Sequence, residues 1–363
     1  MGTEASVGII ANPMAGRDVR RLVARATSMT PETKRDQVAR AAIGAAAAGA
    51  KRIFVCAEPF RISASAVENL DVGAEIVVLD IGATLHAEDT ANAAIAMREA
   101  GCGALVVLGG DGTNRIVAKA WPDVPLVPIS TGTNNVFPVS VEATLAGAAS
   151  GLVASGRISA DEVSRRAKVV TVDIEAGDRD LALVDAVLLV GDRVGNLLPF
   201  DPKNIARVVL ARAEPAAVGT SPIGGLLEPS GFDDDFGVDV ECAHSHARGD
   251  GHAHAGDAGA GISAKRLLVP VSPGLYRTVA VTGVHRLELG EVVEMCGPGV
   301  LAFDGDREHT LDDGQRVRLS VVREGPRVLD VARSLRLAAE RGLYLDREDW
   351  HDSLDERADM GCC

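Results

Sequence analysis

The chain has few aromatic residues, no excess of positive charge and no long apolar run. Its net charge is −14 at pH 7, which argues against a nucleic-acid partner because such proteins present a basic surface. The apolar runs are short and interrupted, so we expect no membrane-spanning helix. With 3% aromatic residues and no basic amphipathic stretch, the chain also lacks the features that hold a protein on a membrane surface. We therefore expect neither a nucleic-acid nor a membrane partner.

Cysteine is sparse and unpatterned. Six cysteines are scattered without a Cys-x-x-Cys pair, which is typical of reduced thiols in a cytoplasmic protein. Residues 1–6 carry neither a basic leader nor a long apolar segment, so we expect no secretory signal. Cys362 and Cys363 have the composition of a lipid-attachment site, but no other membrane signal accompanies them, and we interpret them as part of a tail. The expected location is the cytoplasm.

The first 140 residues alternate apolar runs with helical stretches. The predicted strands span residues 7–10, 52–56, 75–79, 104–108 and 125–129, and the predicted helices include 38–49 and 84–100, the latter capped by Asp89 or Thr90. Strands alternating with helices predict a parallel, doubly wound α/β sheet, in which ligands bind at the carboxyl ends of the strands. A chain of 363 residues is long enough for a second domain with its own core.

The pattern changes after a helix predicted over residues 142–154, which we interpret as a bridge between domains. Residues 170–174 and 317–321 alternate apolar and polar side chains, as antiparallel strands do. We therefore predict a β-rich domain over residues 141–326. A helical period returns from residue 327 to 341, and we expect residues 327–345 to pack back on the first domain, followed by a frayed tail at 346–363.

A low-complexity insertion at residues 242–257 lies within the predicted β-rich domain. Its two His-x-His pairs, His244 with His246 and His252 with His254, have a spacing that could share a metal on a strand. The alternative is a loop of glycine, alanine and histidine that binds nickel or zinc only adventitiously. We favour the loop, because no adjacent secondary structure would hold the two pairs in one geometry. We assign no metal-ligating residue.

Three glycines surround an aspartate at the end of the fourth predicted strand, in the run Gly109, Gly110, Asp111, Gly112 and Thr113. A buried strand, a glycine turn and a helix start are how α/β proteins present backbone N–H groups to phosphate. Glycine allows close approach and positive φ, and Thr113 is suited to cap the helix. A carboxylate at an anion site fits a role in holding Mg²⁺ or in taking a proton from a hydroxyl. The alternative is a turn with Asp111 as the cap.

This motif, together with residues 12–16, resembles the NAD kinase and diacylglycerol kinase superfamily. Residues 109–115, 131–138, 210–215 and 221–225 are similar to its AcoX-type branch, which is named for acetoin catabolism and usually described as ATP–NAD kinase-like. The resemblance runs from the first strand to about residue 343. It implies an N-terminal α/β nucleotide-binding domain, a C-terminal β-sandwich-like domain, a cleft between them, and a homo-oligomer.

The resemblance implies phosphoryl transfer from ATP or another phosphate donor, with Mg²⁺, to a hydroxyl of a small molecule, with NAD(H) as the default acceptor. Asp111 would orient or deprotonate that hydroxyl. The implied phosphate-binding residues are Asn12, Gly16, Gly109, Gly110, Gly112 and Thr113, with Arg17 adding a positive charge, and the implied substrate loop is Thr131, Gly132, Thr133, Asn134 and Asn135. For the loop with Asn12 and for the loop from Thr131 to Asn135, the alternative is an ordinary asparagine-containing turn.

The chain departs from the family pattern at two places. NAD kinases carry an Asn-Glu pair where this chain has Val184 and Asp185; valine cannot make the hydrogen bonds of asparagine, whereas Asp185 retains an acid for substrate binding. Lipid-kinase relatives carry Asp-Gly-Glu where the chain has Asp304, Gly305 and Asp306, so Asp306 is a second candidate catalytic acid with a shorter reach. The alternative for this run is a hairpin turn.

These departures leave the acceptor open. Besides NAD(H), the sequence allows a different small alcohol or polyol related to acetoin as the acceptor. A non-catalytic nucleotide-binding regulator is a third hypothesis, which the intact Asp111 disfavours. A lipid acceptor is disfavoured by the scarcity of aromatic residues.

Overall fold

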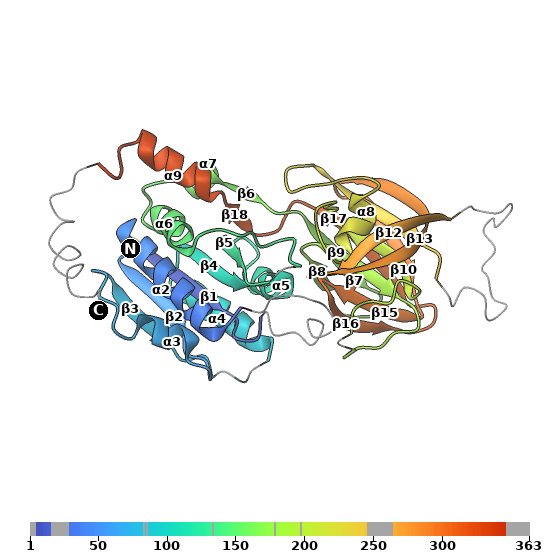
Figure 1. The fold of residues 1–363 in the computed structure, drawn as a ribbon, viewed down its shortest axis with the longest axis horizontal. Helices are drawn as coiled ribbons and strands as arrows, with labels where there is room; N and C mark the ends of the chain where they lie inside the picture. The colour runs from blue at the N-terminus through green and yellow to red at the C-terminus, as the bar shows by residue number, and fades with distance from the viewer. Residues whose placement is uncertain are drawn as a thin grey trace.

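In the computed structural model the chain forms an α/β domain and a β-rich domain side by side (Figure 1). The structure describes residues 5–15, 29–82, 84, 86–132, 134–177, 179–196, 198–244 and 264–345. Gly16, Arg17 and Thr133 lie outside the described residues, as do residues 245–257 of the His-rich insertion and the tail at 346–363.

A seven-stranded sheet in the order β3-β2-β1-β4-β5-β18-β6 forms the first domain. Its strands are β1 (Ser6–Ala11), β2 (Arg52–Cys56), β3 (Glu75–Leu79), β4 (Ala104–Gly109), β5 (Pro125–Ser130), β6 (Ser164–Arg166) and β18 (Arg327–Leu329). All neighbouring pairs from β3 to β18 are parallel, and β6 is antiparallel to β18. The predicted doubly wound parallel sheet is confirmed.

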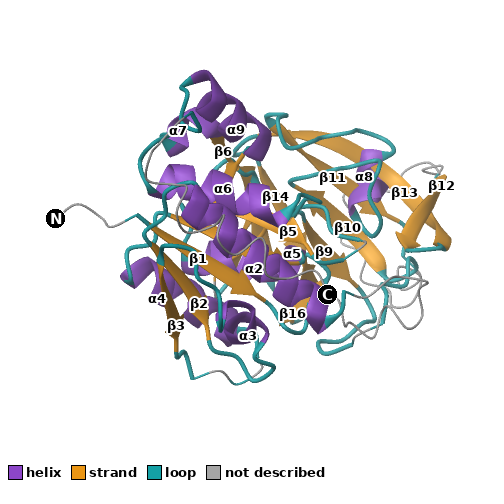
Figure 2. Cartoon of the chain, turned by 60° about the vertical axis from the view of Figure 1, so that its left-hand side comes forward, coloured by secondary structure: helices purple, strands orange, loops and turns teal. Residues whose placement is uncertain are grey.

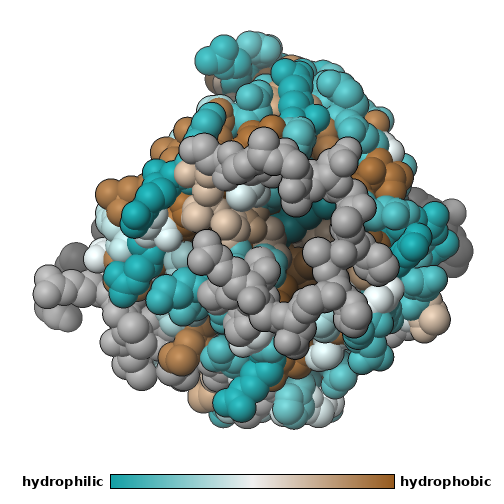
Figure 3. All heavy atoms as spheres, turned by 90° about the vertical axis from the view of Figure 1, so that its right-hand side faces the viewer, coloured by the Kyte–Doolittle hydropathy of each residue, from teal (hydrophilic) through white to brown (hydrophobic). Residues whose placement is uncertain are grey.

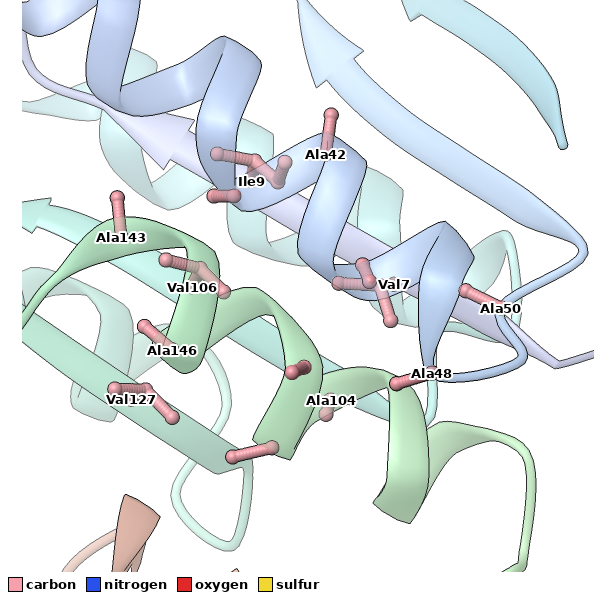
Figure 4. Close-up of a cluster of buried hydrophobic side chains, with 14 of the residues drawn as sticks. Val7, Ile9, Ala42, Ala48, Ala50, Ala104, Val106, Val127, Ala143 and Ala146 are labelled. Atoms are coloured by element: carbon pink, nitrogen blue, oxygen red, sulfur yellow. The ribbon is translucent and has the colours of Figure 1, made fainter. Parts of the chain in front are cut away.

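Helices cover both faces of this sheet. One face packs against α2 (Pro31–Ala47), α3 (Ile62–Val67), α6 (Ala143–Ala154) and α9 (Val331–Glu340), and the other against α4 (Glu88–Glu99) and α5 (Asp111–Ala120). Figure 2 shows α2 and α6 next to each other. Figure 4 shows Val7 and Ile9 of β1 and Val106 of β4 in one cluster with helix alanines such as Ala42 and Ala146.

The contact between α2 and α6 brings two helix backbones together. A Cβ at Gly44 would lie 2.0 Å from the carbonyl oxygen of Thr144, and a Cβ at Gly147 would lie 2.0 Å from that of Ala41. Only glycine permits this approach. We predicted residues 142–154 as a bridge and placed the second domain from residue 141. The structure instead includes α6 in the layers of the first domain, because its small residues fit against α2 and the sheet.

We expect Gly147→Ala to lower the free energy of unfolding by about 2–3 kcal/mol, because its methyl group would overlap a backbone oxygen that cannot move aside. Gly101→Ala is the matched control: it adds a methyl group where no atom lies within 4 Å, at a φ of +78°. That control should lose about 1 kcal/mol from backbone strain alone. Urea unfolding of both variants measures the difference, and equal losses would contradict the close helix contact.

Two antiparallel sheets form the second domain, in the orders β12-β13-β11-β10-β9-β15-β16 and β14-β17-β7-β8. Their strands are β7 (Val169–Ile174), β8 (Arg179–Ala182), β9 (Asp185–Leu189), β10 (Ile205–Leu210), β11 (Phe236–Cys242), β12 (Lys265–Ser272), β13 (Leu275–Glu288), β14 (Val292–Cys296), β15 (Gly299–Phe303), β16 (Asp306–Leu311) and β17 (Arg316–Val322). The two predicted alternating segments are β7 and β17, which pair with Val172 opposite Leu319. Residues of both sheets share a core, and α8 (Ser221–Gly225) packs on the outer face of the larger sheet.

The chain crosses to the second domain after the short helix α7 (Ala160–Val163) and β6, and it returns through β18. We predicted a helix from residue 327, but residues 327–329 extend the first sheet, with Val328 opposite Leu126. The helix α9 therefore begins at Val331, capped by the Asp330 carboxylate, which accepts from the N–H of Arg333 at 2.9 Å. α9 packs on α6.

The described surface of the second domain is mixed in character. Figure 3 shows that the described part of this face is mostly hydrophilic, with hydrophobic residues in small separate groups. The most exposed hydrophobic side chains of the domain include Leu268, Tyr276 and Val292. None of the helices that the structure describes is long and apolar enough to cross a membrane.

Candidate functional site

A cavity of about 560 Å³ opens between the two domains. On the first-domain side it is lined by the segments that follow β1, β4 and β5, together with the start of α4. On the other side it is lined by segments around residues 199–205, 218–223 and 304–306. The first-domain wall is thus the carboxyl edge of the parallel sheet, where α/β proteins bind their ligands.

The glycine-rich turn joins β4 to α5 at this edge. Gly110 is the N-cap of α5 without a side-chain cap, so neither Asp111 nor Thr113 caps the helix as we had considered. We also expected positive φ at these glycines, but none of the three has it. They are needed for close approach: a Cβ at Gly109 would lie 2.5 Å from Thr113 Cβ, and one at Gly110 would lie 3.0 Å from Asn135 Oδ1.

The carboxylate of Asp111 bridges two loops at the cavity wall. Its Oδ1 accepts from the N–H of Phe137 at 2.7 Å, and both oxygens accept from the N–H of Val136 at 3.1 Å. Burial and the nearby carboxylate of Asp304 raise its pKa to about 7, although the two amides act to lower it. Asp111 is therefore fixed at the cavity and titrates near neutral pH.

Asn12 shapes the loop after β1. Its amide donates to Thr113 Oγ1 at 2.9 Å, while its Oδ1 accepts from the N–H groups of Met14 at 2.8 Å and Ala15 at 3.2 Å. An asparagine that bonds the backbone two residues on forms an Asx turn, so the turn that we considered as an alternative is present. The separate bond from the Asn12 amide to Thr113 ties this loop to the first turn of α5, and both segments line the cavity.

A buried lysine that the sequence analysis missed lies beneath this loop. Lys34 is 1% exposed, and its Nζ donates to the carbonyl oxygens of Asn12 at 2.9 Å, Pro13 at 3.0 Å and Ala15 at 2.5 Å. Its position in the first turn of α2 gave no signal, because a lysine there is normally solvated. The buried Lys34 ammonium group therefore holds the loop after β1 in place on the side that faces away from the cavity.

Replacing Lys34 with methionine should lower the free energy of unfolding by about 2–4 kcal/mol, because three carbonyl oxygens lose a charged donor. Lys51→Met provides the comparison, since Lys51 is exposed and surface substitutions usually change stability by less than about 0.5 kcal/mol. Denaturant unfolding of both variants is the measurement. A Lys34→Met protein as stable as Lys51→Met would show that the loop does not depend on this cation.

The run that resembles the lipid-kinase motif forms a hairpin turn. Asp304 and Gly305 connect β15 to β16 with φ of +51° and +92°, as in a type I′ turn. The Asp304 carboxylate accepts from the N–H groups of Leu183 and Val184, both at 2.8 Å, and of Asp185 at 3.2 Å. The hairpin alternative therefore describes Asp304 and Gly305, and Asp304 fixes the backbone before β9.

The candidate acid Asp306 lies on the other side of this turn and reaches the first domain. A Cβ at Gly112 would lie 2.9 Å from Asp306 Oδ2, so this carboxylate stands against the first turn of α5. Both residues line the cavity. The structure thus brings the two acids that we singled out, Asp111 and Asp306, to the same cavity from different domains.

Asp185, at the start of β9, is the most enclosed acid of the cavity. It is 4% exposed; its Oδ2 accepts from Thr220 Oγ at 2.5 Å, and its Oδ1 has no hydrogen-bond partner among the described residues. Burial, followed by the carboxylates of Asp304 and Asp111, raises its pKa to about 8. The pKa of Asp304 is also raised, to about 6, by burial. The three acids titrate as a coupled group.

The neighbouring Val184 does not line the cavity. It is 1% exposed and belongs to the hydrophobic core of the first domain's α4–α5 face. The position where NAD kinases carry asparagine therefore offers no polar group to a ligand.

The loop after β5 is braced internally. Ser130 Oγ donates to the carbonyl oxygen of Gly132 at 2.9 Å and accepts from the Asn135 amide at 2.8 Å. Thr131, Asn134 and Asn135 line the cavity, whereas Gly132 does not. Thr131 is 2% exposed, and its hydroxyl has no hydrogen-bond partner among the described residues.

A second feature missed by the sequence analysis joins the domains beside the cavity. Arg115 of α5 is 3% exposed. It donates to the carbonyl oxygen of Leu181 at 2.6 Å and to Glu308 at 2.7 Å, and it forms an ion pair with Asp180 at 2.8 Å. Burial opposes the ionisation of Asp180, but Arg115 and hydrogen bonds from His309 and Lys119 hold its pKa at about 2. α5 lies at the junction of the two domains (Figure 1), so the helix that begins at Asp111 is fastened to the second domain.

The buried acids predict a pH dependence of stability. The folded-state pKa of Asp185 is raised above its ordinary value, so the folded state binds more protons than the unfolded state between about pH 4 and pH 8, and stability falls as the pH rises. Asp185→Asn removes this effect, and its amide oxygen can still accept from Thr220. We expect the variant to be more stable than the wild type by about 4–5 kcal/mol at pH 8 and nearly equal at pH 4.

Thermal unfolding at the two pH values measures this difference. Asp123→Asn, at an exposed position, should leave the pH dependence unchanged. If Asp185→Asn has the same pH profile as the wild type, the pKa of Asp185 is not raised in the folded state.

Comparison with known proteins agrees with this architecture. Residues 7–158 match the ATP-NAD kinase N-terminal domain, and residues 168–324 match the acetoin catabolism protein X C-terminal domain. A curated relative, acetoin catabolism protein X of Cupriavidus necator, is 35% identical over 349 residues, which cover 93% of each chain. The chain belongs to the acetoin catabolism protein X (AcoX) family. This confirms the predicted AcoX-type branch of the NAD kinase-like proteins.

Solved structures similar to this AcoX-family chain are distant in sequence. Yeast NADH kinase complexed with NADH has a TM-score of 0.47 at 12% identity, covering 94% of this chain and 88% of the kinase. A putative diacylglycerol kinase from Bacillus anthracis has a TM-score of 0.40 at 12% identity, covering 91% and 98% of the two chains.

Proposed function

We propose that this AcoX-family protein is a phosphotransferase that moves a phosphoryl group from ATP, with Mg²⁺, to a hydroxyl of a small molecule bound between the domains. The observation that carries the proposal is the position of Asp111: its carboxylate is fixed by two backbone amides, beside the N-terminus of α5, on the wall of a cavity that both domains line. Phosphoryl transfer asks a protein mainly to position an acceptor oxygen and to compensate negative charge.

The α5 N-terminus is the site for the donor phosphates. Its first turn contains Gly112 and directly follows Gly109 and Gly110, and it directs backbone N–H groups and the positive end of the helix dipole to the cavity. None of the described residues that line the cavity is a lysine or arginine, so further charge compensation is assigned to Mg²⁺. Asp111 and Asp306 supply the hard oxygen ligands that suit this ion, which typically keeps several waters and binds together with phosphates.

Asp111 is the candidate general base. A base works best when its pKa lies near the working pH, and the pKa of about 7 for Asp111 meets this condition. Its hydrogen bonds to Val136 and Phe137 set the direction of the carboxylate. Asp306, contributed by the second domain, stands across the first turn of α5 and is the second acid available to the acceptor or to the ion.

The acceptor has two candidates. NAD(H) is the default, from the matched ATP-NAD kinase domain at residues 7–158. The burial of Val184 in the core removes the hydrogen-bonding group that NAD kinases have there, and this favours the second candidate, a small alcohol related to the acetoin catabolism named in the curated relative.

We expect Asp111→Asn to lower the rate of phosphoryl transfer at least ~100-fold, the usual scale for a positioned acid–base group. The fold should be retained, because the asparagine oxygen can accept from the same two amides. The assay is ATP consumption with Mg²⁺ and a panel of NAD, NADH, small alcohols and polyols, with Asp123→Asn as the control for an exposed acid. Near-normal turnover of Asp111→Asn would defeat the assigned role. Nucleotide binding by the wild type without ATP consumption for any acceptor would indicate a regulator instead.

A further inference from the structure

The cavity between the domains is strongly acidic. Its described lining includes five carboxylates, from Asp89, Asp111, Asp185, Asp304 and Asp306. All five have at least one contact within the protein. A negatively charged ligand would be repelled by these acids, and the described lining has no lysine or arginine side chain to offset the repulsion.

Two buried polar atoms on the same wall have no partner among the described residues. One is Oδ1 of Asp185, whose other oxygen is already bound to Thr220, and the second is Oγ1 of Thr131. Buried polar groups are nearly always hydrogen-bonded, and an unpaired one is costly. Because both residues line the cavity, we expect a bound ligand to supply the missing hydrogen-bond partner of each atom. A carboxylate oxygen in this position calls for a hydrogen-bond donor.

We infer that the acceptor is a small molecule with at least two hydroxyl groups and no negative charge, held by hydrogen bonds from its non-reacting hydroxyls to Asp185 and Thr131. The inference relies on the proposed function only in calling this ligand the acceptor. In the proposed function Mg²⁺ and the α5 N-terminus offset the charge of the donor phosphates, but none of the described lining residues is a lysine or arginine that would offset a charge on the acceptor. A carboxylate or phosphate on the acceptor would be repelled by Asp185, Asp304 and Asp111, so sugar acids and phosphorylated metabolites are rejected. NAD(H), which carries a pyrophosphate, is disfavoured for the same reason.

The test compares ligands that differ in one end group, hydroxymethyl or carboxylate, by isothermal titration of the full chain without ATP at pH 9, above the pKa of about 8 of Asp185. Glycerol is paired with glycerate, and erythritol with erythronate. We expect each neutral polyol to bind at least about tenfold more tightly than its acid, because like charges repel strongly in a partly buried site. Equal or tighter binding of the acids, or no measurable binding of any neutral probe, would overturn the inference.

Two variants locate the preference. Asp185→Asn keeps an acceptor for Thr220 but removes the charge, so the difference between erythritol and erythronate should shrink to about threefold or less. Thr131→Val keeps the shape of the side chain and should weaken erythritol binding about tenfold, which corresponds to the loss of one hydrogen bond. Asp123→Asn is the control for a change of net charge alone. An unchanged difference in Asp185→Asn, with the melting temperature confirming a folded protein, would overturn the assignment of Asp185.

The binding data also separate this inference from the proposed function. A clear preference for neutral polyols without ATP consumption would support the ligand class and defeat the kinase proposal. ATP-dependent phosphorylation of NAD or of a sugar acid at the same site would support the kinase proposal and overturn the ligand class.

Discussion

The site depends on a buried ion pair between the domains. Arg115 and Asp180 are each 3% exposed and 2.8 Å apart, and the guanidinium also binds Glu308 and the backbone of Leu181. A buried pair is weak evidence for net stability, but removing one partner leaves an uncompensated charge and is strongly unfavourable. Since Arg115 follows Asp111 by one helical turn, the same helix presents its N-terminus to the cavity and is held to the second domain. The relative position of Asp111 and Asp306 follows from this contact.

The acids of the cavity are held against their mutual repulsion by the backbone. Asp111 accepts two amide N–H groups and Asp304 accepts three, which favours their charged forms. Burial acts in the opposite direction on the pKa of both, and for Asp111 the carboxylate of Asp304 does so as well. Among the described residues, Thr220 is the one hydrogen-bond donor to the carboxylate of Asp185, which has the highest pKa of the three. Such conflicts are typical of functional sites, where groups are arranged for a ligand rather than for stability. As a result, the acids that line this single cavity differ from one another in pKa.

The sequence predicts this site to the extent that its signals are local. Alternating strands and helices placed Asp111 at the carboxyl edge of a parallel sheet, and the Asp-Gly pair at 304 indicated the hairpin. Lys34 and Arg115 were not found, because their partners lie 19 to 193 residues away and nothing in the neighbouring residues marks them. Of the two reasons expected for the glycines at 109 and 110, close approach applies, here to Thr113 and Asn135, and positive φ does not. α6 was misplaced because its small residues carry no clear apolar face.

The difference between Val184 and Asp185 shows how one segment can change ligand specificity without changing the fold. The two residues lie in different environments. Val184 packs with Leu183 in the hydrophobic core on the α4–α5 face of the first sheet, whereas Asp185 lines the cavity. Asp304 binds the backbone N–H of both, so the segment keeps its course whatever side chains it carries. A polar side chain at 184 would need a partner or would leave a buried group unsatisfied. With valine at position 184, Asp185 is the residue of this segment that can bind a ligand. The cavity is therefore suited to a ligand that donates hydrogen bonds to a carboxylate.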